Sequence, residues 1–128
     1  MVQWIYGCEV FLVLDDIGKA KPEPSTSRLY SEYEQHIPPG SLSEMVLRHL
    51  LGSGRVRFVD RPPRQKSVQV QKICPKNKGD QAVLGAAAMS VDKLLISNDW
   101  KDFDCFARRL ILKELSVRCV DSESAVAA

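Results

Sequence analysis

The sequence predicts an α/β fold with a mainly parallel sheet. Short apolar runs rich in β-branched residues alternate along the chain with segments of helical periodicity. Capping residues open the helical segments, and Gly or Pro residues end them. Strands that alternate with helices are typical of parallel sheets. A length of 128 residues is that of one domain, and we expect residues 1–128 to form a single one.

The first predicted strand is Val10–Leu14, a short apolar run that ends at a turn. A Pro-containing loop at 20–27 follows, because each Pro removes a backbone donor and disfavours helix at the residue before it. A helix can begin only after this loop. Ser27 is the expected N-cap of that helix, which covers Arg28–His36.

A capping box opens the next helix. The Ser41 hydroxyl and the Glu44 carboxylate satisfy free amide groups at its start, and Gly52-Ser53-Gly54 ends it after about Leu51. The strand Arg55–Val59 then alternates charged and apolar residues, as a half-exposed strand does.

The second half begins with a basic linker at 60–78. We expect it to be irregular around its two prolines, with a short strand or helix over Ser67–Ile73. Asp80–Ser90 is apolar nearly all round, which predicts a helix buried in the core. The remaining elements are expected to be a strand, a helix, a strand and a frayed tail: Lys93–Ser97, Phe103–Leu115, Val117–Val120 and the residues after 121.

Several classes of protein are excluded by composition. The longest apolar run, Val10–Leu14, is far shorter than the roughly 18 residues that a membrane span needs. The N-terminal segment lacks a basic region and contains Glu9, so we expect no secretory signal and a cytoplasmic protein. The cysteines form no CxxC pair, which favours buried free thiols over a zinc site or disulfides: Cys8, Cys74, Cys105 and Cys119.

Charge is concentrated in the middle of the sequence. Between positions 55 and 78, eight basic residues stand against one acidic residue, so the segment carries +7 while the whole chain carries +2. A cationic strip of this kind favours a polyanionic partner. The candidate nucleic-acid-binding residues are Arg55, Arg57, Arg61, Arg64, Lys66, Lys72, Lys76 and Lys78.

Acidic residues follow two of the predicted strands. In parallel sheets, ligands bind beyond the carboxyl ends of the strands. Carboxylates gathered there repel one another unless a hard divalent cation such as Mg²⁺ or Mn²⁺ neutralises them, and such a site hydrolyses phosphodiesters. The acids in question are Asp15 and Asp16 after the first strand, Asp99 and Asp102 after the third, Asp80 at a helix start, and Glu32 on an early helix.

These residues resemble a known family. Gly79-Asp80, followed by the stretch from Leu94 to Phe103, resembles the second half of a PIN domain, and Leu29–Tyr33 is similar to its Glu-Tyr segment. PIN domains are small α/β ribonucleases, many of them toxins of toxin–antitoxin pairs. The resemblance implies a three-layer α/β/α fold, Mg or Mn as cofactor, and these roles: Glu32, Asp80 and Asp99 as metal-binding catalytic acids, with Asp102 and Ser97 in support.

The first half of the resemblance has two alignments. In one, Asp15 is the opening catalytic acid, Asp16 supports it, and the chain is an active endoribonuclease. In the other, the Val-Leu-Asp-Asp run directly precedes the Glu-Tyr segment, the opening strand is missing, and the chain is a shortened, inactive module for binding RNA or protein. A sheet without its central strand would leave apolar faces uncovered, which favours the first alignment.

Three functional hypotheses follow. The first is a metal-dependent endoribonuclease that acts on RNA, and the second is an inactive PIN-like binding module. The third is a protein-interaction unit that docks an antitoxin or a second copy of itself as a homodimer. No membrane partner is expected.

Overall fold

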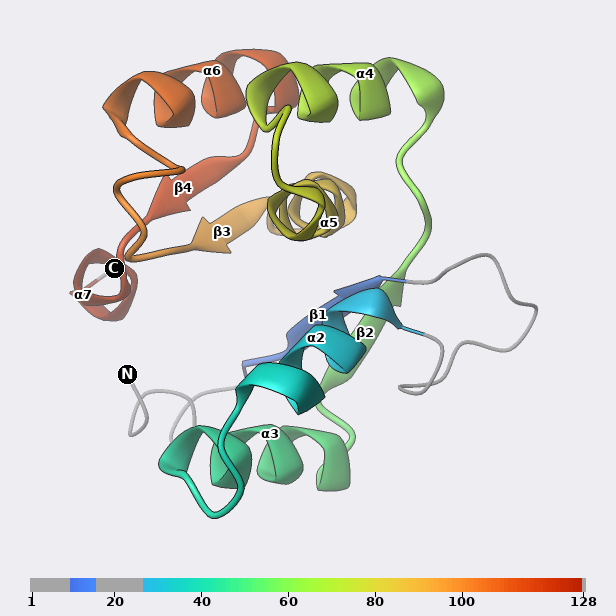
Figure 1. Cartoon of the computed structure of the whole chain (residues 1–128), viewed down its shortest axis with the longest axis vertical. Helices are drawn as coiled ribbons and strands as arrows, with labels where there is room; N and C mark the ends of the chain where they lie inside the picture. Colours follow the sequence, from blue (N-terminus) through green and yellow to red (C-terminus); the bar gives the residue numbers. More distant parts are fainter. Residues whose placement is uncertain (1–9, 16–26, 128) are drawn as a thin grey trace. The chain divides into compact units, whose positions relative to one another are not determined.

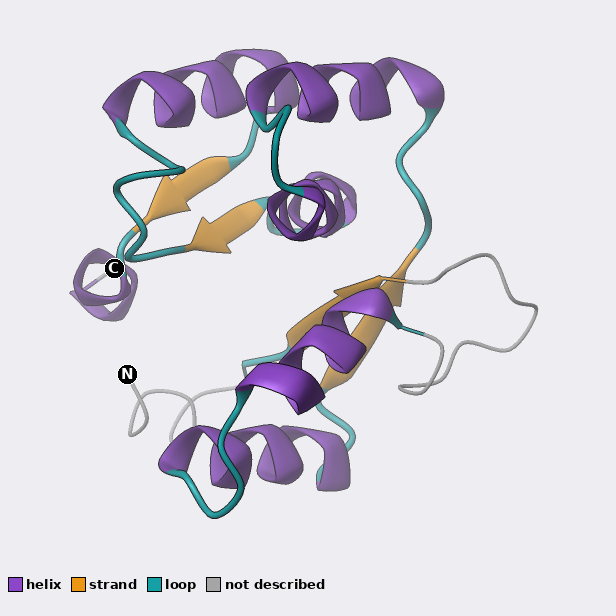
Figure 2. Cartoon of the chain, viewed as in Figure 1, coloured by secondary structure: helices purple, strands orange, loops and turns teal. Residues whose placement is uncertain are grey.

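The chain divides into two compact units, Met1–Asp60 and Arg61–Ala128, and each is described by itself. The structure is a computed structural model that describes residues 10–15 and 27–127 (Figure 1). Helices alternate with short parallel strands in both units, which confirms the predicted α/β class (Figure 2).

Some of the expected features lie outside the described residues. They are Asp16, Cys8 and the Pro-containing loop apart from Ser27.

The described part of the first unit contains one pair of parallel strands, β1 (Leu12–Asp15) and β2 (Val56–Val59). Leu12 on β1 lies opposite Val56 on β2, and Asp15 lies opposite Val59. Leu14 on β1 is fully buried, and Leu29 on α2 and Leu50 on α3 are buried as well. The elements are β1 (Leu12–Asp15), α2 (Arg28–His36), α3 (Leu42–Gly52) and β2 (Val56–Val59).

Helices α2 and α3 both begin at the predicted caps. Ser27 accepts a hydrogen bond from the Tyr30 amide at 3.2 Å, and Ser41 accepts one from the Glu44 amide at 3.2 Å. The Glu44 carboxylate in turn accepts from the Gly40 amide at 3.3 Å. Gly54 has a φ of +71°, a conformation that glycine adopts readily, and it turns the chain from α3 into β2.

The second unit also contains one pair of parallel strands. Leu94 on β3 lies opposite Arg118 on β4, and α6 connects the two strands. Helix α6 runs beside α4 and packs on β4, while α5 contacts α4 and β3 (Figure 1). The elements are α4 (Arg64–Ile73), α5 (Lys78–Met89), β3 (Leu94–Ile96), α6 (Cys105–Leu115), β4 (Arg118–Val120) and α7 (Ser122–Ala127).

The core of the second unit forms around α5, as its apolar sequence predicts. The buried cluster includes Leu84 and Ala88 from this helix, Ile111 and Leu115 from α6, and Val117. Gly85 lies against Pro62: a Cβ at this glycine would come within 3.2 Å of the proline Cγ. The close approach explains a glycine in the middle of a helix, where it is otherwise unfavourable.

Two segments are more ordered than the sequence indicates. The basic linker contains helix α4 from Arg64 to Ile73, which is held in place because Val70 and Cys74 are buried in the core. The two prolines precede its first turn, where a missing amide N–H costs little. The tail expected to fray forms α7, and Ala125 on it is buried.

One finding bears on membranes. Among the described helices, none combines the length and the apolar character that a membrane crossing requires.

The core gives a direct stability prediction. Ile111 is 0% exposed, whereas its neighbour Leu112 is 54% exposed. Ile111→Ala should lower the free energy of unfolding by about 2–5 kcal/mol, because it removes buried methyl groups and leaves a cavity. Leu112→Ala, the matched control, should change it by no more than about 0.5 kcal/mol. Urea unfolding followed by circular dichroism measures both, and equal effects would contradict the placement of α6.

Candidate functional site

A loop of residues 97–103, here called the acidic loop, follows the carboxyl end of β3. Asp99 organises it: one carboxylate oxygen accepts hydrogen bonds from the amides of Lys101 and Asp102, both at 3.0 Å. The Ser97 hydroxyl accepts a hydrogen bond from the Asp99 amide at 3.1 Å. The hydrogen bond from the Asp102 amide is the main reason why the pKa of Asp99 lies below its usual range.

A buried arginine holds the acidic loop from behind. The Arg108 side chain on α6 donates to the Phe103 carbonyl at 2.6 Å, to the Ser97 carbonyl at 3.0 Å and to the Asp99 carbonyl at 3.3 Å. Its guanidinium carbon lies 3.7 Å from the centre of the Trp100 ring. Only 9% of Arg108 is exposed, and its Nη1 has no hydrogen-bond partner among the described residues. The loop therefore has a fixed backbone.

Asp80 brings a third carboxylate to this loop. It lies in the first turn of α5, whose N-cap is Asn77. Burial raises the pKa of Asp80, and the charge of Asp102, a hydrogen bond between the two carboxyl groups and the charge of Asp99 raise it further. The structure therefore brings together Asp80, Asp99 and Asp102, here called the acid cluster.

Cys74 is an independent marker of the acid cluster. Its pKa is raised to about 11, first by burial and then by the charges of Asp80 and Asp102. A thiol with this pKa stays protonated at neutral pH and is unreactive. The prediction of buried free thiols is confirmed for Cys74, whereas Cys105 is exposed and Cys119 half-buried.

Asp15 and Glu32 belong to the first unit. Asp15 accepts hydrogen bonds from the Ser27 hydroxyl at 2.7 Å and from the amides of Leu29 at 2.8 Å and Arg28 at 3.2 Å. Both of its oxygens therefore cap the N-terminus of α2, a role that the sequence analysis did not give it. Glu32 lies 3.3 Å from the imidazole of His36, one turn further along α2.

The predicted basic residues are divided between the two units. Arg55 and Arg57 are on or beside β2 in the first unit, and the Arg57 guanidinium covers the Phe11 ring at 4.2 Å. The others belong to the second unit, where they lie before α4, on it, in the loop after it or at the start of α5: Arg61, Arg64, Lys66, Lys72, Lys76 and Lys78.

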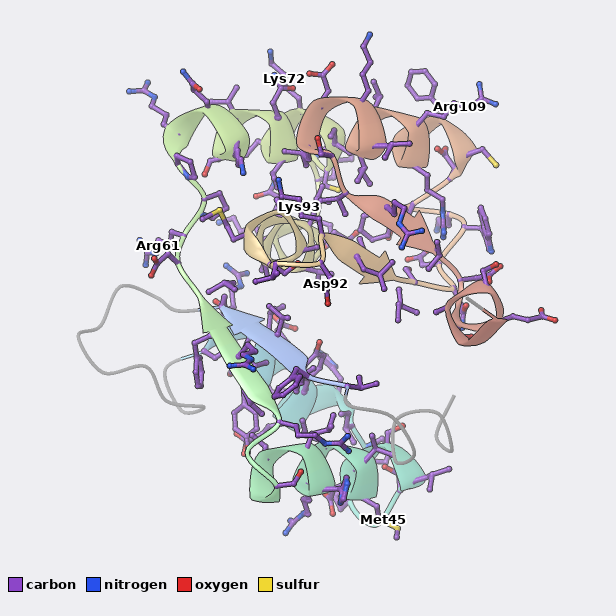
Figure 3. The ribbon with its side chains drawn as sticks, turned by 180° about the vertical axis from the view of Figure 1, so that it is seen from behind. Met45, Arg61, Lys72, Asp92, Lys93 and Arg109 are labelled. Carbon is purple, nitrogen blue, oxygen red and sulfur yellow. The ribbon has the colours of Figure 1, made fainter. Side chains whose placement is uncertain are left out.

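Helix α6 adds cations that the sequence analysis missed. Arg109 and Lys113 are exposed on this helix, which contacts α4. Figure 3 shows Lys72 and Arg109 extending from the outer side of these two helices. The missed signal is the amphipathic pattern of α6, which buries Ala107 and Ile111 and turns these two basic residues outward.

The acid cluster has the donor type that a hard cation requires, since Mg²⁺ and Mn²⁺ prefer carboxylate oxygens. Within residues 10–15 and 27–127, however, no three His, Cys, Asp or Glu side chains are grouped closely enough to hold a metal ion. The charges of Asp102 and Asp99 act on Asp80, but the three carboxylates are not arranged as a finished coordination shell.

Comparisons with known proteins add no assignment. No model of a protein family matches the chain, and no curated protein or solved structure matches it significantly.

The pKa of Asp80 predicts a pH dependence of stability. Its folded pKa lies above the usual 3.8, so the folded chain holds this proton more tightly than the unfolded chain does. The stabilisation is complete below 3.8 and is lost as pH rises through the folded pKa. Asp80→Asn cannot ionise, so its stability relative to the wild type should increase from acidic to neutral pH.

Urea unfolding across this pH range measures the difference. The matched control is Asp92→Asn, at an exposed acid in the turn before β3, outside the acid cluster (Figure 3). The difference in unfolding free energy between Asp92→Asn and the wild type should not increase from acidic to neutral pH as it does for Asp80→Asn. A difference in unfolding free energy between Asp80→Asn and the wild type that is constant with pH would show that the fold does not raise the pKa of Asp80.

Proposed function

We propose that this protein is a divalent-metal-dependent endoribonuclease of PIN type that uses Mg²⁺ or Mn²⁺. The observation that carries the proposal is the gathering of Asp80, Asp99 and Asp102 at the carboxyl end of β3, where burial and the charges of Asp102 and Asp99 disfavour the ionised form of Asp80. Structural stability alone does not favour like charges in one place. A bound cation would neutralise these charges and offset their repulsion.

The acid cluster would hold the cation, with Asp80 and Asp99 as ligands and Asp102 beside them. A bound cation of this kind supplies Lewis-acid activation of water and stabilises charge on the phosphate. The chain's own residues fix the donors: the Ser97 hydroxyl and the Arg108 guanidinium hold the backbone on which Asp99 stands. Carboxylates held in this way need little reorganisation when the substrate binds.

RNA is the proposed substrate because cations surround the α4–α6 face. Exposed Lys72 on α4 and Arg109 on α6 would contact phosphates, together with the other basic residues of the second unit. Binding through phosphates weakens steeply as salt increases. The proposal extends to the three-layer α/β/α arrangement, and to an antitoxin protein or a second copy as partner.

A second candidate function rests on Asp15. Both of its oxygens are engaged in capping α2, which is the role expected of a structural acid. The chain would then be a shortened PIN-like module that binds RNA without cleaving it. This candidate predicts salt-sensitive RNA binding with no turnover in Mn²⁺.

The decisive variant for the first candidate is Asp99→Asn. The amide keeps the oxygen that accepts the two backbone hydrogen bonds of the acidic loop but removes the negative charge. We expect Mn²⁺-dependent cleavage of single-stranded RNA to fall by roughly 100-fold or more, as happens when a group that stabilises the transition state is lost. Gel analysis of a labelled RNA measures the loss.

Two controls separate the candidates. Asp92→Asn removes an exposed charge outside the acid cluster and should cleave like the wild type. Asp15→Asn tests the first unit: unchanged cleavage would assign Asp15 to the cap of α2 alone. Wild-type protein that binds RNA but does not cleave it in Mn²⁺ or Mg²⁺ would reject the nuclease and leave the binding module.

A further inference from the structure

Trp100 is an aromatic residue in an unusual position. It lies within the acidic loop, between the acids Asp99 and Asp102, and 51% of it is exposed. Turns in which backbone amides are satisfied by Asp side chains are usually built from small polar residues. A half-exposed indole at such a turn contributes little to the core.

The Trp100 ring is nevertheless held in place. The Arg108 guanidinium covers it, 3.7 Å from the ring centre. Arg108 cannot move freely, because its nitrogens donate to the carbonyls of Phe103, Ser97 and Asp99 and only 9% of the residue is exposed. A planar cation on one face leaves the other face as the part of the ring that can receive a ligand.

Phe106 provides a contrast within the same unit. It is also exposed, at 71%, on the first turn of α6, but no cation of the described residues lies over its ring. A ring whose orientation is already fixed loses less conformational entropy on binding. Both rings are exposed, but the orientation of the Trp100 ring is fixed before a ligand binds and that of the Phe106 ring is not.

We propose that Trp100, held by Arg108, is a stacking platform for an unpaired nucleobase, so that the substrate is single-stranded RNA. This inference rests on the proposed function, because the acids on either side of Trp100 would place the reacting phosphate next to its ring. Bases stack on aromatic side chains with little regard to sequence. Bases within a duplex are already stacked on one another and are not free to do so.

The test compares two probes with equal charge. One is a short single-stranded RNA, and the other is an abasic oligomer with the same number of phosphates. Both are titrated in EDTA, so that no cleavage takes place. The wild type should bind the RNA roughly 5- to 150-fold more tightly than the abasic oligomer, which corresponds to the stacking of one base.

Substitutions assign this preference to Trp100. Trp100→Leu keeps an apolar group against Arg108 without an aromatic face and should abolish the preference, while Trp100→Phe should restore most of it. Phe106→Ala is the matched control and should leave it unchanged. In a Trp4→Phe background, the RNA but not the abasic oligomer should quench the fluorescence of Trp100. Circular dichroism confirms that each variant is folded.

The outcomes distinguish this inference from the proposed function. A wild type without preference for the RNA, or a Trp100→Leu variant that keeps the preference, would overturn the stacking platform whatever the cleavage assay shows. Loss of the preference in Trp100→Leu supports the platform even if no metal-dependent cleavage is found. In that case the nuclease proposal is rejected, while RNA binding by the acidic loop is supported.

Discussion

The acid cluster exists only because the fold holds like charges near one another against their repulsion. Asp80 comes from α5, while Asp99 and Asp102 come from the loop after β3. Both loop residues nevertheless affect the ionisation of Asp80. The loop keeps this arrangement because backbone amides bind Asp99 from one side and Arg108 binds the loop carbonyls from the other. The hydrogen bonds hold carboxylates near one another despite their charge, as ligand sites often do at the expense of stability.

The two units use their acids in opposite ways. Asp15 is fully satisfied, because three hydrogen bonds from the start of α2 meet its two oxygens. Asp80 meets other carboxyl groups instead, and its charged form is disfavoured. Asp15 therefore has a structural role at the start of α2. The position of Asp80 has no such structural role and is accounted for by a bound ligand. The acid cluster is for this reason the centre of the proposed function.

Local signals in the sequence predicted much of the fold. Ser27 and Ser41 cap helices because a hydroxyl next to free amides forms a hydrogen bond whatever the tertiary context. Helix α4 was not foreseen as a whole, since burial of Val70 and Cys74 in the core stabilises a segment whose own sequence is rich in charge. Of the site, strand ends predicted the positions of Asp99 and Asp102. The role of Arg108 depends on three carbonyls brought together by the fold, and no spacing in the sequence encodes that.

The titration of the Asp80 carboxyl group, followed by NMR with and without Mg²⁺, tests the central claim most directly. Burial of Asp80, together with the charges of Asp102 and Asp99, predicts a pKa above the usual 3.8 in the absence of the cation and a clear downward shift when the cation is added. An Asp80 that titrates at its ordinary value, or that does not respond to Mg²⁺, would contradict a cation site at the carboxyl end of β3.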